Sequence, residues 1–182
     1  IAGARHIFRA GMHVRGGGFA WQSFVGSELF GKTIGIIGLG SIGMRVAELL
    51  NCLGMRVVAN TATPSKARAN SMKIELMPIE KVFAESDFIS VHCGLNSDTS
   101  GLIDEHLVSF ARKRPFFINT ARAEIVDENA LLKALKTGQI SGAALDVIQD
   151  PPLDSALPIT RLDNVLLTPH CGFASSRALA QK

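Results

Sequence analysis

Three glycines in the first quarter of the chain have the spacing of a turn that binds phosphates. Gly38, Gly40 and Gly43 form the pattern G-x-G-x-x-G within "GKTIGIIGLGSIG". The first glycine permits a tight turn, the second lets the backbone approach a pyrophosphate, and the third lets a helix and a strand pack closely. The free backbone N–H groups of Ser41 and Ile42 would then face the phosphates. The pattern therefore predicts a dinucleotide-binding site.

The position that usually selects the cofactor lacks its acid. A carboxylate about 20 residues after such a turn binds the adenine ribose of NAD and repels the 2′-phosphate of NADP. That position falls here at Asn60 or Thr61, and the next acidic residue after Glu48 is Glu75. The sequence therefore predicts a site that accepts NAD or NADP with weak discrimination. The loop that follows contains Ser65, Lys66 and Arg68. These side chains could contact a phosphate of the cofactor, or the loop could be solvated and its side chains touch nothing.

Short apolar segments alternate with helical segments along most of the chain. "TIGIIG" is an apolar, β-branched run that ends in glycine, and it predicts a buried strand. "SIGMRVAELLNCLG" ends in Gly54 and places five apolar residues on one helical face: Ile42, Val46, Leu49, Leu50 and Leu53. Further strands are expected in "MRVVAN", "DFISVHC", "PFFINT", "ISGAALDV" and "NVLLTP", and helices in "PIEKVFAES", "DEHLVSFARK" and "DENALLKALKTG". The alternation predicts an α/β fold, a doubly wound parallel sheet with helices on both faces.

Ligands of such sheets bind at the carboxyl ends of the strands. The loops at that edge are "GLGSIG", "NTATPS", "HCGLNSDTSG", "NTARAE", "DVIQDPP" and "TPHCGF". Beyond the glycine turn, we expect cofactor contacts from residues in these loops: Asn60, Thr61, His92, Cys93, Gly94, Thr99, Thr120, Ala121, Arg122, Asp146, His170 and Gly172.

Composition argues against several classes of partner. The net charge of +3 comes without a basic run, and a chain with one Trp and no Tyr offers little for stacking on nucleic-acid bases. No uncharged apolar run is long enough for a membrane span, and "IAGARHIFRAGMHVRGGG" lacks the apolar core of a signal peptide. Cys52, Cys93 and Cys171 lack metal-like spacing and read as reduced thiols. We therefore expect a cytoplasmic protein without a metal, nucleic-acid or membrane partner.

Four segments occur in the order and spacing of one enzyme family. "GKTIGIIGLGSIG", "ESDFISVHCGL", "FINTARAEIVDENALLKALKTGQISGAALDV" and "NVLLTPHCG" together resemble the D-2-hydroxyacid dehydrogenases, over nearly the whole chain. That family includes phosphoglycerate dehydrogenases and hydroxypyruvate or glyoxylate-type reductases. The resemblance implies hydride transfer between NAD(P) and a D-2-hydroxy acid or 2-keto acid. Because the family also contains transcriptional corepressors, a dinucleotide-sensing interaction module without catalysis is the alternative.

The resemblance also implies roles for individual residues. Arg122 in "NTAR" matches the family's arginine for the substrate carboxylate, which its planar fork engages with two hydrogen bonds. His170 in "TPH" matches the proton-transfer histidine, a side chain that titrates in the useful range. Asp146 matches an aspartate near the nicotinamide carboxamide. His92 matches a residue on the adenine side, or is a simple histidine at the end of a strand.

Three positions depart from the family pattern. A glutamate before a proline, five residues after the equivalent of Asp146, usually holds the catalytic histidine. The ungapped position here is Pro151, and Asp150 precedes it in "DPP". We expect Asp150 to be a shorter substitute, since the histidine otherwise has no carboxylate partner. Gly94 stands where "xPL" is usual and Ala123 where "NTARG" is usual, and both are expected near the nicotinamide.

The resemblance divides the chain into three parts. Residues 1–28 are expected to form an interdomain helix and a dimerisation arm, residues 29–170 the dinucleotide-binding domain, and residues 171–182 the start of a returning segment. The family's substrate domain is absent from this sequence, so we expect the chain alone to be inactive. The segment around Trp21 and "VGSELFGK" resembles the family's dimerisation arm and predicts a homodimer with symmetric contacts.

Overall fold

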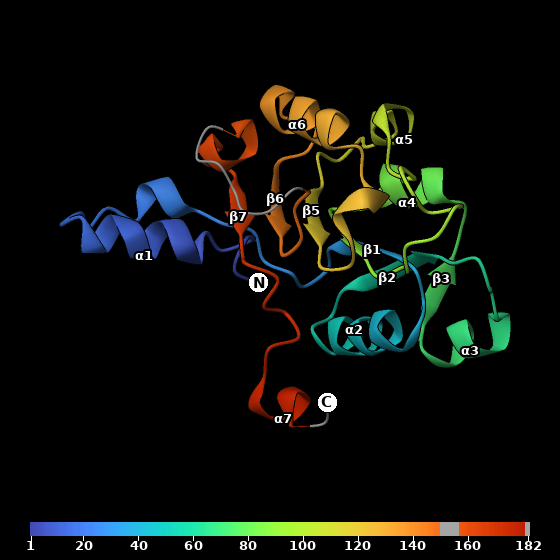
Figure 1. Cartoon of the computed structure of the whole chain (residues 1–182). Coiled ribbons are helices and arrows are strands. Elements are labelled where there is room, and N and C mark those ends of the chain that lie inside the picture. Colours follow the sequence, from blue (N-terminus) through green and yellow to red (C-terminus); the bar gives the residue numbers. More distant parts are fainter. Residues whose placement is uncertain (150–156, 181–182) are drawn as a thin grey trace.

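The structure is a computed structural model that describes residues 1–149 and 157–180, and its centre is one parallel sheet. Seven strands lie in the order β3-β2-β1-β4-β5-β6-β7, and every neighbouring pair is parallel (Figure 1). Their bounds are β1 Thr33–Ile37, β2 Arg56–Asn60, β3 Ile74–Leu76, β4 Phe88–Val91, β5 Phe116–Asn119, β6 Gly142–Leu145 and β7 Val165–Leu167. The chain moves outward from β1 in both directions, which confirms the predicted doubly wound sheet.

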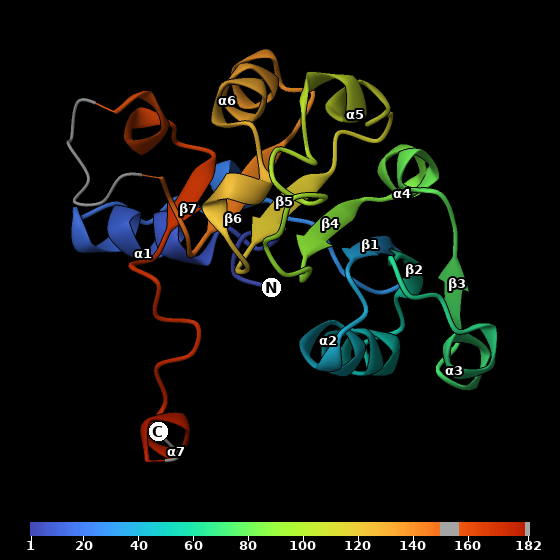
Figure 2. The same cartoon turned by 45° about the vertical axis from the view of Figure 1, so that its right-hand side comes forward.

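Helices cover both faces of the sheet. Figure 2 shows α2 and α3 on one face and α4, α5 and α6 on the other. The helices are α1 Ile7–Arg15, α2 Ser41–Cys52, α3 Lys66–Ser71, α4 Ile79–Glu85, α5 Glu105–Ser109, α6 Glu128–Thr137 and α7 Ser176–Leu179, with 3₁₀ turns η1 Gln22–Phe24, η2 Ala123–Ile125 and η3 Pro158–Arg161. No helix within the described ranges is long and apolar enough to cross a membrane.

The core forms two apolar clusters, one on each face. Ile34 and Ile36 of β1 belong to the cluster that includes Ala47 of α2, whereas Ile37 belongs to the cluster that includes Phe83 of α4. Successive side chains of a strand point to opposite faces, so a strand buried on both faces is apolar throughout. That is why β1 has no charged residue and continues after Thr33 as the apolar run "IGII", with every residue of the strand buried.

Local signals place the helix ends where the sequence predicts them. The carboxylate of Asp127 accepts hydrogen bonds from the backbone N–H groups of Asn129 and Ala130 and so caps α6. Gly138 ends α6 with a φ of 75°, and Gly54 follows α2 with a φ of 74°. Both glycines occupy the left-handed region that other residues avoid.

The structure differs from the sequence expectation in four elements. β3 and α3 lie in a stretch for which no element was predicted, and α5 is shorter than "DEHLVSFARK". α2 turns its small residues, Gly43 and Ala47, to the interior, whereas Ile42 is 68% exposed and Leu49 51% exposed. After β7 the chain leaves the sheet and ends near the short helix α7 (Figures 1 and 2).

Candidate functional site

The glycine turn between β1 and α2 has no room for side chains at two of its three glycines. A Cβ atom on Gly38, whose φ is 97°, would lie 2.4 Å from the backbone nitrogen of Cys93. A Cβ atom on Gly43 would lie 2.1 Å from the carbonyl oxygen of Gly38. Gly40 is different, because no atom lies within 4 Å of the place where its Cβ would be. The turn is therefore packed on its inner side and open on its outer side, where a ligand can approach.

The first turn of α2 leaves backbone donors facing this open side. Gly40 is the N-cap residue, and no side chain among the described residues caps the helix. The first helical hydrogen bond runs from the N–H of Met44 to the carbonyl of Gly40. The N–H groups of Ser41 and Ile42 precede that bond, and at a helix N-terminus such groups attract anions.

The carboxyl end of β2 has no acid where a ribose carboxylate usually stands. Asn60 donates from its side chain to the carbonyl of Met77, 3.1 Å away, and half-buried Thr61 follows it. Glu75 forms an ion pair with Arg56 at the other end of β2. Hydrogen bonding to Arg56 lowers the pKa of Glu75 below its ordinary value, so this carboxylate is charged but engaged elsewhere.

Arg68 of α3 reaches across to the first turn of α2. Its Nη1 lies 3.4 Å from the sulfur of Met44, so a cation stands between the loop after β2 and the glycine turn. Ser65 caps α3 by accepting a hydrogen bond from the N–H of Arg68. Lys66, the first residue of α3, is exposed beside them.

His92 and Cys93 follow β4 and pack beneath the glycine turn. The Nε2 atom of His92 lies 2.9 Å from the hydroxyl oxygen of Ser90. Burial lowers the pKa of His92 and raises the pKa of the Cys93 thiol, so both side chains are neutral near neutral pH. His92 also supports Gly43, since a Cβ there would lie 3.3 Å from the His92 Cβ.

The next turn is organised by the hydroxyl group of Thr99. It donates to the carbonyl of Gly94 at 2.7 Å and accepts from the N–H of Asn96 at 2.8 Å. Gly94 itself is exposed, and a Cβ there would meet nothing within 4 Å. The hydroxyl of Thr99 therefore serves the shape of the turn, while Gly94 leaves its outer side open.

Arg122 stands on a turn that Asn119 fixes at the end of β5. The side chain of buried Asn119 accepts from the N–H of Ala121 at 3.0 Å and donates to the carbonyl of Arg122 at 2.9 Å. The guanidinium of Arg122 is exposed and bonds the carbonyl of Ala121 at 2.7 Å. Thr120, at the tip of this turn, is also exposed.

His170 lies in a tight turn just after β7. Its φ is 53°, and its N–H donates to the carbonyl of Thr168 at 3.0 Å. The imidazole ring is exposed and meets the ring of Phe173 edge-on, with 5.7 Å between the centroids. The left-handed backbone is unfavourable for a residue with a Cβ, so neighbouring contacts must hold this turn.

Asp146, directly after β6, supplies those contacts. Its carboxylate accepts hydrogen bonds from the Thr168 hydroxyl and from the N–H groups of Cys171 and Gly172. Burial would raise the pKa of Asp146, but these hydrogen bonds outweigh it and bring the pKa below its ordinary value. The carboxylate is therefore an anion at neutral pH. The register of β6 and β7 brings Asp146 and Thr168 together. Leu145 and Leu167, which directly precede them, are paired across the two strands.

The loops at the carboxyl ends of β5, β6 and β7 surround one cavity. It has a volume of about 580 Å³ and brings Arg122, Asp146 and His170 together with Ala123, Glu124, Val147, Ile148, Leu167, Thr168 and Pro169. The sequence reasoning did not single out Glu124, a carboxylate two residues after Arg122. Asp150, the expected partner of the histidine, and Pro151 lie outside the described residues.

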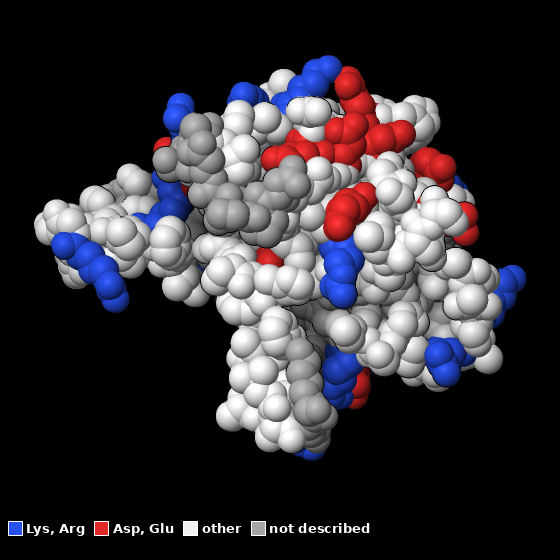
Figure 3. Space-filling view, in the orientation of Figure 1, with Lys and Arg blue, Asp and Glu red and all other residues white. Residues whose placement is uncertain are grey.

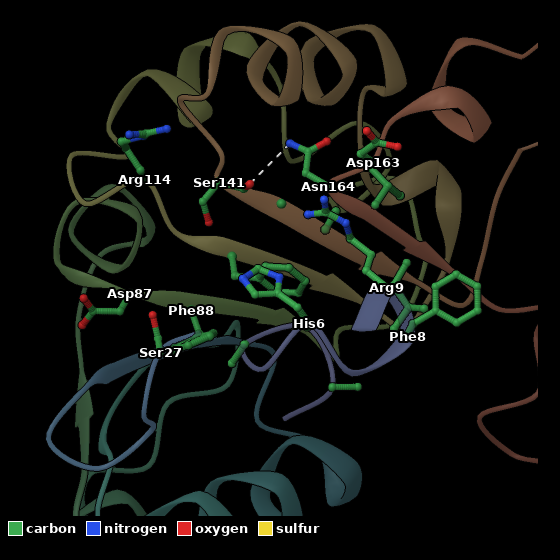
Figure 4. A pocket seen from close by; sticks show the side chains of 18 of the residues that line it. His6, Phe8, Arg9, Ser27, Asp87, Phe88, Arg114, Ser141, Asp163 and Asn164 are labelled. Atoms are coloured by element: carbon green, nitrogen blue, oxygen red, sulfur yellow. Dashed lines mark hydrogen bonds between the residues drawn. The ribbon is translucent and has the colours of Figure 1, made fainter. Parts of the chain in front are cut away.

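A second cavity lies at the opposite edge of the sheet. It has a volume of about 450 Å³ and lies beside α1 at the amino ends of β4, β5, β6 and β7 (Figure 4). Several basic side chains line it, among them Arg9, Lys113 and Arg114. None of the predicted site residues that the structure describes lines it, and ligands of parallel sheets bind at the carboxyl ends of the strands.

The charged side chains show no continuous basic surface on the face drawn in Figure 3. Acidic side chains gather there over α5 and α6, whereas Lys and Arg are scattered. The first turns of those helices carry Glu105 and Glu128, capped by Asp104 and Asp127. Within residues 1–149 and 157–180, no group of three or more His, Cys, Asp or Glu side chains could hold a metal ion.

Comparison with known proteins shows that the chain is similar to reductases and dehydrogenases. A glyoxylate reductase of Pyrococcus horikoshii is 40% identical over 182 residues, which cover 96% of this chain and 54% of that protein. A D-3-phosphoglycerate dehydrogenase of Rattus norvegicus is 40% identical over 176 residues, covering 96% of this chain and 33% of that protein. The chain thus spans about half, or less, of the length of these relatives.

Solved structures agree with the sequence comparison. The apo-structure of D-lactate dehydrogenase from Escherichia coli superposes with a TM-score of 0.90 at 31% identity, over 99% of this chain and 56% of that one. An acyclic imino acid reductase in complex with NADPH and D-Arg gives a TM-score of 0.88 at 34% identity, over 99% and 57% of the two chains. Residues 1–172 match the family described as "D-isomer specific 2-hydroxyacid dehydrogenase, NAD binding domain". The chain therefore belongs to the D-isomer specific 2-hydroxyacid dehydrogenase family, as its NAD-binding domain.

Proposed function

We propose that this chain is the cofactor-binding domain of an oxidoreductase that transfers a hydride between NAD(P) and a D-2-hydroxy acid or 2-keto acid. One observation carries the proposal: Arg122 and His170 line the same cavity, at the sheet edge that also carries the glycine turn. A carboxylate binder and a proton donor beside a dinucleotide turn are the groups that this reaction needs. The glyoxylate reductase and phosphoglycerate dehydrogenase among the relatives support it.

The residues at the carboxyl edge fit a dinucleotide. The open side of Gly40 lets a pyrophosphate approach the backbone, and the uncapped first turn of α2 offers donors to it. A bound nicotinamide would supply or accept the hydride. In this arrangement Ser41 and Ile42 contact phosphate, Thr61 lies on the adenosine side, and the loops after β4 and β5 lie toward the nicotinamide.

Arg122 is proposed to bind the substrate carboxylate. Its guanidinium is exposed in the cavity, stays charged at all relevant pH values, and presents paired donors to a carboxylate. The turn fixed by Asn119 limits where the arginine can point. Substrate is thereby oriented with its 2-carbon near the nicotinamide position.

His170 is proposed to move the proton. During reduction it donates a proton to the carbonyl oxygen as the hydride reaches the carbon, and during oxidation it removes the hydroxyl proton. Its exposed ring lies in the same cavity as Arg122, so one bound acid can touch both side chains. Asp150 is proposed to hold the histidine in its protonated form, in the manner of the family's glutamate.

The cofactor site is proposed to accept NAD and NADP with affinities within about tenfold of each other, a difference below about 1.4 kcal/mol. Thr61 stands where a carboxylate would repel the 2′-phosphate, and Arg68 supplies a cation near the first turn of α2. A 2′-phosphate would gain the attraction of Arg68, whereas NAD would lose only a ribose carboxylate. Both effects move a site that would otherwise prefer NAD toward NADP, and the preference that remains is proposed to be weak.

A homodimer is proposed through residues 1–28. α1 has no buried residue, and the segment carries large exposed apolar side chains: Ile7, Phe8, Met12, Val14, Phe19, Trp21 and Val25. Apolar side chains gathered in one segment of the surface favour a protein contact, and a second copy of the chain is the partner we propose.

The three cysteines are free, which accords with a cytoplasmic location.

The proposal is tested with the full-length protein. Reduction of glyoxylate, hydroxypyruvate and pyruvate is followed by the absorbance of NADH or NADPH, and oxidation of 3-phosphoglycerate and D-lactate in the reverse direction. We expect turnover of at least one acid with both cofactors. Arg122→Lys should raise KM for the acid, and His170→Gln should lower kcat by at least about a hundredfold, the low end of general acid–base catalysis.

Cofactor titration by fluorescence provides the control. Both variants should still bind NADH and NADPH, since the proposed pyrophosphate contacts at the glycine turn remain in both. Cofactor binding without turnover of any acid would contradict the enzyme and leave the dinucleotide-sensing module as the better reading.

A further inference from the structure

The carboxylate of Asp146 joins the end of β6 to the loop that carries His170. Its Oδ1 accepts from the Thr168 hydroxyl at 2.5 Å and from the N–H of Cys171 at 3.0 Å, and its Oδ2 accepts from the N–H of Gly172 at 2.7 Å. The Cys171 thiol lies 3.7 Å from Oδ1 as well. Only 6% of Asp146 is exposed.

The donors lie on both sides of His170 in the sequence. Thr168 precedes the histidine by two residues, and Cys171 and Gly172 follow it directly, so the carboxylate spans the whole turn. Gly172 is required for this approach, because a Cβ there would lie 2.9 Å from Oδ2. Hydrogen bonds to an ionised acceptor are stronger than those between neutral groups.

The turn lies where the chain leaves the sheet. β7 ends at Leu167, and the chain then leaves the sheet toward α7 (Figure 2). Residues 169–177 are exposed, and the backbone at His170 is in the unfavourable left-handed region. The N–H of Thr168 still bonds the carbonyl of Leu145, and beyond it the carboxylate of Asp146 bonds the N–H groups of Cys171 and Gly172.

We infer that Asp146 is a positioning residue that fixes the catalytic loop of His170 through Thr168, Cys171 and Gly172. The family resemblance gave Asp146 a different role, as an aspartate near the carboxamide of the bound nicotinamide. Three of the four lone-pair positions of this carboxylate already accept a hydrogen bond from the loop. The expected effect on kcat rests on the proposed function. The fixing of the His170 loop rests on the hydrogen bonds alone.

Thr168→Val in the full-length protein isolates the positioning role. Valine keeps the shape of threonine but removes the donor, without touching the carboxylate. We expect kcat for 2-keto acid reduction to fall about tenfold, since each factor of ten corresponds to about 1.4 kcal/mol of lost alignment. The dissociation constants of NADH and NADPH should stay within about twofold. Thr168→Ser keeps the hydroxyl and should restore kcat.

Asp146→Asn removes the charge and turns an amide toward one of the N–H donors. It should lower kcat more than Thr168→Val does, again with cofactor affinity kept. Thr137→Val is the matched control, because it removes a single hydroxyl bond, to the carbonyl of Ala134 at 3.2 Å, on α6. That control should leave kcat unchanged.

Hydrogen exchange separates this inference from the proposed function. In Thr168→Val and Asp146→Asn, the amides of Cys171 and Gly172 should exchange at least about tenfold faster, and the NMR signals of the His170 ring should shift. If the natural protein turned over no acid but these amides still exchanged faster, the proposed function would fail and the positioning role would stand. Unchanged exchange and unchanged kcat in Thr168→Val, with cofactor affinity lost in Asp146→Asn, would overturn the inference in favour of a direct cofactor ligand.

Discussion

Gly43 and Gly38 touch so closely that the carbonyl oxygen of Gly38 occupies the space of a Gly43 side chain. A Cβ atom on Gly43 would lie 2.1 Å from that oxygen. The contact joins the first turn of α2 to the end of β1 and is made by backbone, which cannot rotate away. Gly40, between them in the sequence, has open space instead. The same motif thus contains one glycine needed for packing and one whose open side faces the proposed ligand.

Gly43→Ala and Gly40→Ala should therefore fail in different ways. Gly43→Ala overpacks the turn and should lower the free energy of unfolding by about 1–3 kcal/mol. Gly40→Ala should leave that free energy within about 0.5 kcal/mol but weaken NADH and NADPH binding, because its methyl group stands where the pyrophosphate approaches. Urea denaturation and fluorescence titration measure the two effects. Equal loss of stability in both variants would contradict the assignment of the open side.

The sequence predicted the fold well because each central strand is buried on both faces. "TIGII" and "FISV" are mostly apolar, with only Thr33 and Ser90 polar, and every residue of β1 and β4 is buried. The edge strand β3 has only three residues, with Glu75 in the middle, so it lacks that signal. The pattern of α2 was misleading in one respect. Large apolar residues share a face, but the small pair Gly43 and Ala47 is what allows close contact with the sheet.

The site was predicted as a set of strand ends, and its internal bonds were not. The rule that ligands bind at the carboxyl ends of parallel strands indicated the loops, and the family resemblance singled out Arg122, Asp146 and His170 within them. The bond between Asp146 and Thr168 depends on the register of β6 and β7, which pairs Leu145 with Leu167. The sequence does contain a hint of this bond, since "LD" (Leu145–Asp146) and "LT" (Leu167–Thr168) stand at the ends of two neighbouring strands. Glu124 gave no signal, because nothing in "ARAE" indicates that the chain turns it into the cavity.

Arg68→Ala should separate the two cofactors. We expect the affinity for NADPH to fall about tenfold, with NADH changed less than about twofold, because only NADPH carries the 2′-phosphate. Thr61→Asp should shift the preference further toward NADH by adding a carboxylate. Arg45→Ala is the control, since Arg45 is also exposed but already pairs with Glu48. If Arg68→Ala weakened the binding of NADH and NADPH equally, the arginine would not contact the 2′-phosphate.

His92 should make the domain less stable as the pH falls below its ordinary pKa of 6.5. Burial lowers the pKa of His92 in the folded state, so the unfolded chain binds the proton first. Its contribution is complete above about pH 6.5 and is lost as the pH falls toward the folded value. His92→Gln should flatten the dependence of unfolding free energy between about pH 7 and 5. Ser90→Ala keeps the titrating ring and should keep the slope. An unchanged slope in His92→Gln would contradict the prediction.

Met12→Glu with Trp21→Glu should convert the proposed dimer into a monomer. Met12 is 55% exposed on α1 and Trp21 is 73% exposed, so neither charge disturbs a packed core of the single chain. Light scattering after size-exclusion chromatography measures the mass. Leu49→Glu, on α2 with 51% exposure, is the matched control and should leave the dimer intact. A monomeric natural protein, or a double variant that remains dimeric, would rule out this surface.

Asp150→Asn tests the partner of His170 through the pH profile of keto-acid reduction. Reduction needs a protonated histidine, and a neighbouring carboxylate stabilises that form. Removing its charge should therefore move the upper pH limit of kcat to lower pH. Glu124→Gln is the comparison, because Glu124 lines the same cavity. We expect it to leave that limit in place, and a shift with Glu124→Gln alone would transfer the role to Glu124. If neither variant moved the limit, the histidine would act without a carboxylate, and the departure at Pro151 from the family pattern would then weigh against an efficient enzyme.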